Sequence, residues 1–228
     1  MNNKIENIKC IICYTSMQRG TEYVPGIVYG NLPAFIKYRG ITTDYKFIDL
    51  NQFSVNIRHF EYIYISGKKD DRQVYILLMS PGSKFATRSP EFTKLLKPVI
   101  SKHKSQALDI IIISEEPLTN HIKKAIANEF LTKVAQLRIE NHTYDLFKTV
   151  VPEHVAVPKH EIASKEEVEL FCRENYTDID KFPMILAGDP MAVWIGARSG
   201  DVVKITRTSE SAGIAIIYRR CITGVVNQ

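Results

Sequence analysis

The sequence contains little cysteine and tryptophan, and it has no long apolar run. Among its 228 residues stand one tryptophan and four cysteines, which are Cys10, Cys13, Cys172 and Cys221. These cysteines are too few and too scattered for a disulfide framework, and they indicate a reducing compartment. No stretch approaches the roughly 18 apolar residues of a membrane span, and the opening MNNKIENIK lacks the apolar core of a secretory signal. We therefore expect an intracellular protein with no membrane contact.

Cys10 and Cys13 form a C-x-x-C pair, which is the spacing used by zinc sites and redox pairs. A zinc ion would need a second pair of ligands nearby, and Cys172 and Cys221 stand 49 residues apart in the chain. We interpret the early cysteines as small hydrophobic residues of an amphipathic helix over residues 4–18. No cofactor and no metal are expected.

The net charge of +5 is unevenly distributed. Residues 1–150 hold 21 Lys and Arg against 14 Asp and Glu, whereas residues 151–228 hold 9 against 11. A basic half is typical of a surface that faces nucleic acid, because Lys and Arg neutralise phosphates and release counterions. It is also common on a solvated surface, so both interpretations stay open.

The first part of the chain alternates helical and strand patterns. Asn31 is expected to cap a short helix that ends near Tyr38. Residues 61–66 and 73–80 predict a β-hairpin around the turn GKKDDR. A helix should start at Ser89-Pro90, with Pro98 kinking or ending it early.

The apolar run LDIIIIS at residues 108–114 predicts a central strand that is buried on both faces. Thr119 is expected to cap the next helix, and residues 134–140 predict a further strand. This order of elements is typical of an α/β layer domain with a mixed sheet.

The pattern changes near Val151, where VPEHVAVPKH predicts an extended, linker-like segment. Ser164 and Glu167 form a capping box for a helix over residues 165–174. A turn at Gly188-Asp189-Pro190 precedes a short helix that carries Trp194, and residues 202–207 and 214–220 predict two closing strands. We therefore expect an α+β protein with an N-terminal α/β domain over residues 1–147 and a small α+β domain over residues 148–228.

The segment between the closing strands, within GDVVKITRTSESAG, could hold an anion through backbone amides and Ser209 or Ser211. It lacks the Gly-x-x-x-x-Gly-Lys pattern of a phosphate-binding loop, and no helix is expected after it. A hairpin connection inside a docking domain is the favoured interpretation.

Other reactive residue types have structural explanations. His154, His160 and Glu161 lie on the extended segment, and the Glu166-Glu167 pair caps a helix, so a metal site is not expected. Asp189 before Pro190 is typical of a turn. A nuclease with a restriction-endonuclease-like fold would need Glu-x-Lys on the second hairpin strand, and QVYILLMS has none.

The C-terminal part resembles a known family. P-K-H-E, S-x-E-E-V, G-D-P-x-A, G-x-x-x-G-D-V-V-K-I-x-R and S-E-x-A-G follow one another as in the assembly domain of RNA polymerase subunit 5 and of its archaeal counterpart. The resemblance covers roughly residues 150–220. Two positions depart from the family, which commonly has arginine at the places of Val193 and Ile214.

The N-terminal part resembles the jaw domain of the eukaryotic subunit through NIKCIICYTSMQRG and ALDIIIISEEPLTNHIKKAI. Because the archaeal subunit lacks this domain, its presence points to the eukaryotic type or to a large DNA virus. The chain would then work in the nucleus of a cell, or in the cytoplasmic viral factory and the virion.

The resemblance implies a non-catalytic subunit of DNA-directed RNA polymerase. Its C-terminal domain would dock on the largest subunit, and its jaw would lie beside the downstream DNA duplex and contact it without reading sequence. The expected DNA-facing residues are Lys84, Arg88, Lys102 and Lys104. The expected subunit-docking residues are Pro158, His160, Asp189, Pro190, Lys204, Arg207 and Gly213. A free-standing DNA-binding transcription regulator built on the same module is the alternative.

Overall fold

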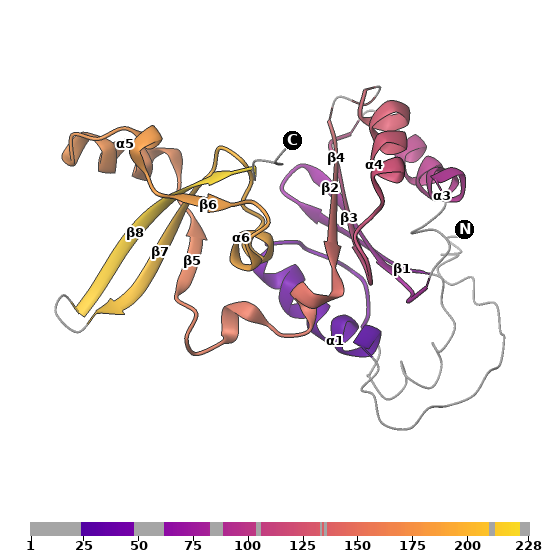
Figure 1. The fold of residues 1–228 in the computed structure, drawn as a ribbon, viewed down its shortest axis with the longest axis horizontal. Coiled ribbons are helices and arrows are strands. Elements are labelled where there is room, and N and C mark those ends of the chain that lie inside the picture. The colour runs from indigo at the N-terminus through magenta and orange to yellow at the C-terminus, as the bar shows by residue number, and fades with distance from the viewer. Residues whose placement is uncertain are drawn as a thin grey trace. The chain divides into compact units, whose positions relative to one another are not determined.

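A computed structural model describes residues 24–47, 62–82, 89–103, 106–132, 134, 136–209 and 213–223. The helix expected over residues 4–18, with Cys10 and Cys13, lies outside these ranges, as do Lys84, Arg88, Lys104 and Ser211. By their contacts the residues form two compact units, Met1–Thr149 and Val150–Gln228. Each unit combines helices with a mixed four-stranded sheet, which confirms the expected α+β class (Figure 1).

The sheet of the N-terminal unit has the order β1 (Tyr62–Lys69), β2 (Arg72–Met79), β3 (Leu108–Ser114), β4 (Leu137–Thr143). β1 and β2 are antiparallel, and β2, β3 and β4 are parallel. Every residue of β3 is buried, as the run LDIIIIS predicts for an interior strand. The mixed sheet and the central position of β3 are therefore confirmed.

Helices cover both faces of this sheet. Figure 1 shows α3 (Ser89–Lys102) and α4 (Asn120–Ile126) on one side and α1 (Val24–Tyr38) on the other. Phe92 and Leu96 of α3 and Ile122 of α4 are fully buried against the strands. The Thr119 side chain accepts a hydrogen bond from the Ile122 amide, so the predicted cap is confirmed. After Ile126 the chain continues in one π-helical turn, Ala127–Leu131.

Several predicted boundaries in this unit are wrong. Asn31 lies inside α1, where its side chain donates to the Phe147 carbonyl at 2.8 Å instead of capping a helix. Pro98 does not end α3, which continues to Lys102. β4 begins three residues later than expected. β1 continues through Lys69 and β2 begins at Arg72, so the turn between them consists of Asp70, at φ 52°, and Asp71.

The sheet of the C-terminal unit has the order β5 (Lys159–Ile162), β7 (Val202–Ser209), β8 (Gly213–Ile222), β6 (Met184–Leu186). β5 and β7, and β7 and β8, are antiparallel, whereas β8 and β6 are parallel. The segment expected to be a linker is instead structured, since a 3₁₀ turn at Val151–Glu153 precedes β5. The two closing strands are confirmed.

Two helices pack on this second sheet. Met191 and Ile195 of α6 (Pro190–Ile195) pack with Val203 and Cys221. Val168 of α5 (Lys165–Glu174) packs with Val202, which points to the opposite face because neighbouring residues of a strand alternate. Among the described residues of either unit, no helix is both long and apolar enough to cross a membrane.

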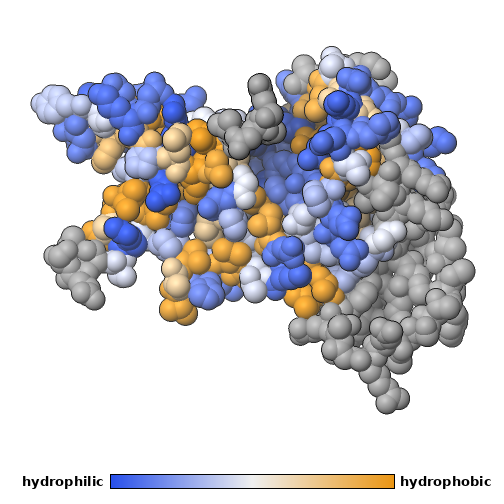
Figure 2. All heavy atoms as spheres, in the orientation of Figure 1, coloured by the Kyte–Doolittle hydropathy of each residue, from blue (hydrophilic) through white to orange (hydrophobic). Residues whose placement is uncertain are grey.

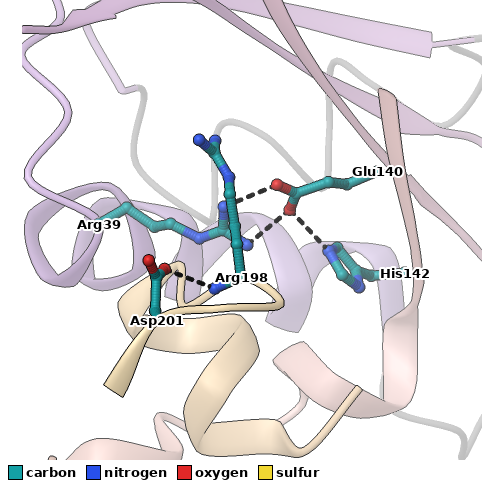
Figure 3. Close-up of polar contacts among 5 residues, drawn as sticks. All are labelled: Arg39, Glu140, His142, Arg198 and Asp201. Atoms are coloured by element: carbon teal, nitrogen blue, oxygen red, sulfur yellow. Dashed lines mark hydrogen bonds and ion pairs between the residues drawn. The ribbon is translucent and has the colours of Figure 1, made fainter. Parts of the chain in front are cut away.

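One charge cluster joins α1 to the sheet of the N-terminal unit. Arg39, which is 5% exposed, places Nη2 2.8 Å from Oε2 of Glu140 on β4. His142 Nε2 lies 3.2 Å from the same oxygen, and Figure 3 shows both side chains converging on the carboxylate. Burial works to raise the pKa of the Glu140 carboxyl, but His142 and the charge of Arg39 outweigh it and hold the pKa at about 2.

This cluster predicts a pH-dependent stability. The pKa of Glu140 is lowered from 4.5 in the unfolded chain to about 2, so the stabilisation is complete above pH 4.5 and is lost as the pH falls toward 2. Glu140→Gln should lower the free energy of unfolding at pH 7 by on the order of 3 kcal/mol. In urea titrations the difference from the wild type should shrink below pH 4.5.

The matched control is Glu116→Gln, because Glu116 is exposed. It should leave the free energy of unfolding nearly unchanged. A Glu140→Gln deficit that stays constant from pH 7 to pH 3 would contradict the assigned role.

Candidate functional site

Glu167 joins α5 to the β7–β8 hairpin. The Ser164 hydroxyl accepts a hydrogen bond from the Glu167 amide at 3.2 Å, which confirms the expected N-cap. The Glu167 carboxylate, however, does not complete the capping box. Its Oε1 accepts from Lys204 Nζ at 2.6 Å and from the Tyr218 hydroxyl at 2.8 Å, and these two hydrogen bonds lower the pKa of Glu167.

Lys204 and Tyr218 meet because of strand register. They are Cα partners in the antiparallel β7–β8 pair, so their side chains leave the same face of the sheet. The Tyr218 ring packs against Phe171 of α5 at 4.5 Å between ring centroids, and Phe182 also lies beside it. Lys204, which was expected as a docking contact, is therefore ion-paired with Glu167 within the chain.

Asp189 and Pro190 begin α6. The Asp189 Oδ1 atom accepts from the Met191 amide at 2.8 Å, and Pro190 occupies the first helical turn, where an amide is not needed. Gly196, at φ 76°, ends the helix in the left-handed conformation. The interpretation of Asp189 as a turn-organising residue is therefore confirmed.

The Gly-Asp pair of the G-D-V-V-K motif makes the turn into β7. Gly200 has φ 98°, a backbone conformation that would be strained for a residue with a side chain. The Asp201 Oδ2 atom accepts from the Arg198 amide at 2.8 Å (Figure 3), and the Asp201 carbonyl accepts from the Cys221 amide at 2.7 Å. Asp201 thus ties this turn to β8.

The other expected docking residues lie apart from this turn. His160, on β5, has Nδ1 2.7 Å from the Pro158 carbonyl. Arg207 is exposed on β7, and Gly213 begins β8 with φ 69°. The docking candidates therefore belong to three places, which are β5, the start of α6 and the β7–β8 hairpin.

The two positions that depart from the family differ in exposure. Val193 is 2% exposed within α6, so its side chain offers no surface to a partner. Ile214 is 65% exposed on β8, opposite Thr208. Of these two positions, only Ile214 can change the surface that a partner meets.

Sequence reasoning missed a set of exposed apolar side chains on one face of the second sheet. Strand register directs them to the same face as Tyr218, beside the area that α5 covers. They are Met184, Leu186, Ile214 and Ile216, each at least half exposed. No period-2 pattern in the sequence marks them, because MIL and GIAI contain no polar residue that alternates with the apolar ones.

The residues considered for binding a metal ion or DNA do not form a comparable cluster within the described ranges. Within the described ranges, no three His, Cys, Asp or Glu side chains gather in an arrangement for a metal ion. Lys102 is exposed at the end of α3. The outward faces of α3 and α4 carry further exposed lysines that the sequence reasoning did not select, namely Lys94, Lys97, Lys123 and Lys124.

Several known proteins are similar to the C-terminal unit of this chain. The family model described as "RNA polymerase Rpb5, C-terminal domain" matches residues 149–221. The subunit Rpo5 of the DNA-directed RNA polymerase of Methanocaldococcus jannaschii is 43% identical over 76 residues, which are 33% of this chain and 97% of that protein. The Rpo5 subunit of Archaeoglobus fulgidus is 46% identical over 72 residues, covering 32% and 95%.

A viral relative extends the match to both units. The "DNA-directed RNA polymerase RPB5 homolog" of African swine fever virus is 26% identical over 189 residues, which are 81% of this chain and 91% of that protein. The fold and these matches define a subunit of DNA-directed RNA polymerase. More narrowly, the chain belongs to the RPB5/Rpo5 family.

The cluster around Glu167 predicts a selective loss of stability. Tyr218→Phe removes one hydroxyl that donates to the Glu167 carboxylate, so it should lower the free energy of unfolding by about 1 kcal/mol. Tyr176→Phe is the matched control, because the Tyr176 side chain is 95% exposed. Urea unfolding followed by near-UV circular dichroism measures both, and equal effects of the two substitutions would refute the role of the Tyr218 hydroxyl.

Proposed function

We propose that this chain is a non-catalytic subunit of a DNA-directed RNA polymerase, docked on the largest subunit through residues 148–228. The observation that carries the proposal is the extent of the archaeal relatives. The match to this one unit takes in 97% of the Methanocaldococcus jannaschii protein, which is itself named a polymerase subunit. A chain that consists almost wholly of this unit must hold its assembly surface there.

The distribution of exposed apolar side chains supports the same assignment. Among the described residues, the exposed large hydrophobics of the N-terminal unit are Tyr38 and Leu131. The C-terminal unit exposes more of them: Val155, Ile162, Leu170, Tyr176, Ile179, Met184, Leu186, Ile214 and Ile216. Met184, Leu186, Ile214 and Ile216 share one face of the sheet, and exposed apolar residues gathered in this way are typical of protein interfaces.

The N-terminal unit is proposed to act as a jaw beside downstream duplex DNA. Residues 1–150 carry a net charge of +7, and α3 and α4 present exposed lysines that include Lys102. Figure 2 shows hydrophilic residues over these two helices. Lysines on a helical surface can position a duplex through its phosphates without reading its sequence.

The division of labour between the units is testable by truncation. Removing residues 150–228 should abolish incorporation into the polymerase, whereas residues 150–228 alone should be incorporated. The measurement is co-purification with a tagged largest subunit after co-expression of the polymerase subunits. Size-exclusion chromatography should place the full chain with the polymerase. Retained assembly of residues 1–149, or a full chain that elutes alone, would contradict the proposal.

The DNA contact has a separate test. Replacing Lys84, Arg88, Lys102 and Lys104 by glutamine should leave assembly intact and weaken the grip of the polymerase on downstream DNA. Each lost phosphate contact should reduce the slope of log affinity against log salt by about 0.9. Electrophoretic mobility shifts of the assembled polymerase at several salt concentrations give this slope.

The matched control for charge neutralises four exposed cations of the C-terminal unit, namely Lys159, Lys165, Arg173 and Lys181. It should leave the salt slope unchanged. Equal slopes for the wild type and the jaw variant would refute the assignment of these four residues to DNA.

A further inference from the structure

β6 is an edge strand whose outer side is open within the described part of the chain. It pairs with β8 alone, at one end of the sheet. The Pro183 carbonyl accepts from the Arg220 amide and the Ala187 amide donates to the Ile222 carbonyl, both at 2.8 Å. Alternate residues of a strand direct their backbone groups to the same edge. Met184 and Leu186 therefore direct theirs away from β8.

The outward backbone groups of β6 form a short pairing template. The Leu186 carbonyl already accepts from the Asp189 amide at 2.9 Å. The amides of Met184 and Leu186 and the Met184 carbonyl are left directed outward. A row of such groups is what an added strand binds.

Apolar side chains accompany this edge. The side chains of Met184 and Leu186 are 58% and 52% exposed. A hollow of about 480 Å³ lies beside them, lined by Met184, Ile185, Leu186, Gly188, Asp189 and Arg219. A strand that paired with β6 would bury these side chains and fill the hollow with its own.

The opposite edge of the sheet has a different character. β5 carries Lys159 and Glu161, whose charged groups lie 2.7 Å apart and are largely exposed. Charged side chains on an edge strand are a common protection against unwanted strand pairing. β6 contains only Met184, Ile185 and Leu186, so it lacks this protection.

The charges around the hollow indicate the chemistry of its occupant. Arg219 is exposed and has no ion-pair partner within the described ranges. The Asp189 carboxylate, by contrast, already accepts the Met191 amide, and Arg220 is paired with Asp180. Of the two charged side chains that line the hollow, Arg219 is therefore the one without a hydrogen-bond or ion-pair partner in the described ranges.

We propose that β6 is extended by a strand from another polymerase subunit, an apolar extended segment with a carboxylate that pairs with Arg219. This inference rests on the proposed function, because it takes the partner from the polymerase. It adds the binding mode, which is pairing at the outer edge of β6, and the charge of the partner segment.

Hydrogen exchange on the full chain tests the pairing. The amides of Met184 and Leu186 should exchange on the order of 100-fold more slowly in the assembled polymerase than in the isolated chain. The outward amides of β5, those of His160 and Ile162, should not change. Protection at β5 without protection at β6 would overturn the proposal. So would amides of β6 that are already protected in the isolated chain, because its own residues or a second copy would then cover the edge.

Two substitutions test the contacts through incorporation with a tagged largest subunit. Leu186→Pro removes one outward amide and keeps the register with β8, and Ile162→Pro is its control on β5. Arg219→Glu reverses the charge, and Arg173→Glu on exposed α5 is its control. Each β6-side variant should reduce incorporation on the order of 10-fold relative to its control. Urea unfolding verifies that each variant folds.

The outcomes separate this inference from the proposed function. If the wild-type chain is not incorporated at all, both fail. If the wild type is incorporated but the β6 amides stay unprotected, the pairing is refuted and the subunit assignment stands. Incorporation of Arg219→Glu at the wild-type level would refute the charge contact in the same way.

Discussion

The antiparallel pairing of β7 with β8 is the constraint on which the C-terminal unit depends. Its register brings Lys204 and Tyr218 to one face, where both bind the Glu167 carboxylate and anchor α5. The same alternation directs Val203 and Cys221 to the other face, where α6 packs. A shift of one residue would exchange the two faces and separate Lys204 from Glu167. The hairpin therefore decides which helix covers which side.

β8 also connects this core to the exposed edge. Its outer side holds β6, and the open apolar side chains of β6 and β8 lie on the face that α5 covers only in part. A surface that continues a core face needs no separate scaffold, because the hairpin already holds its residues in place. The C-terminal unit has fewer than 80 residues, and its match covers 97% of the archaeal relative from Methanocaldococcus jannaschii. In a unit of this size, one hairpin can hold both the core and the exposed surface.

The N-terminal unit depends on a different arrangement. A fully buried parallel strand, β3, separates two helical layers, and the part-buried pair of Arg39 and Glu140 ties the end of α1 to the sheet edge at β4. Breaking such a pair leaves a buried charge without compensation, so its loss is more costly than the loss of an exposed pair. The lysines of α3 and α4 on this unit are exposed to solvent, and it is for this surface that the DNA contact is proposed.

The sequence by itself determined the elements whose signals are local. Composition and periodicity located β3, the caps at Thr119 and Ser164, the turn at Asp189 and the closing hairpin, because caps, turns and buried runs are recognisable within a few residues of sequence. Only the tertiary structure decided where Glu167 directs its carboxylate, how far α3 continues past Pro98, and which apolar residues of β6 and β8 stay uncovered. These outcomes depend on partners such as Lys204 and α5 that are distant in the chain, and no local pattern encodes the register that brings them together.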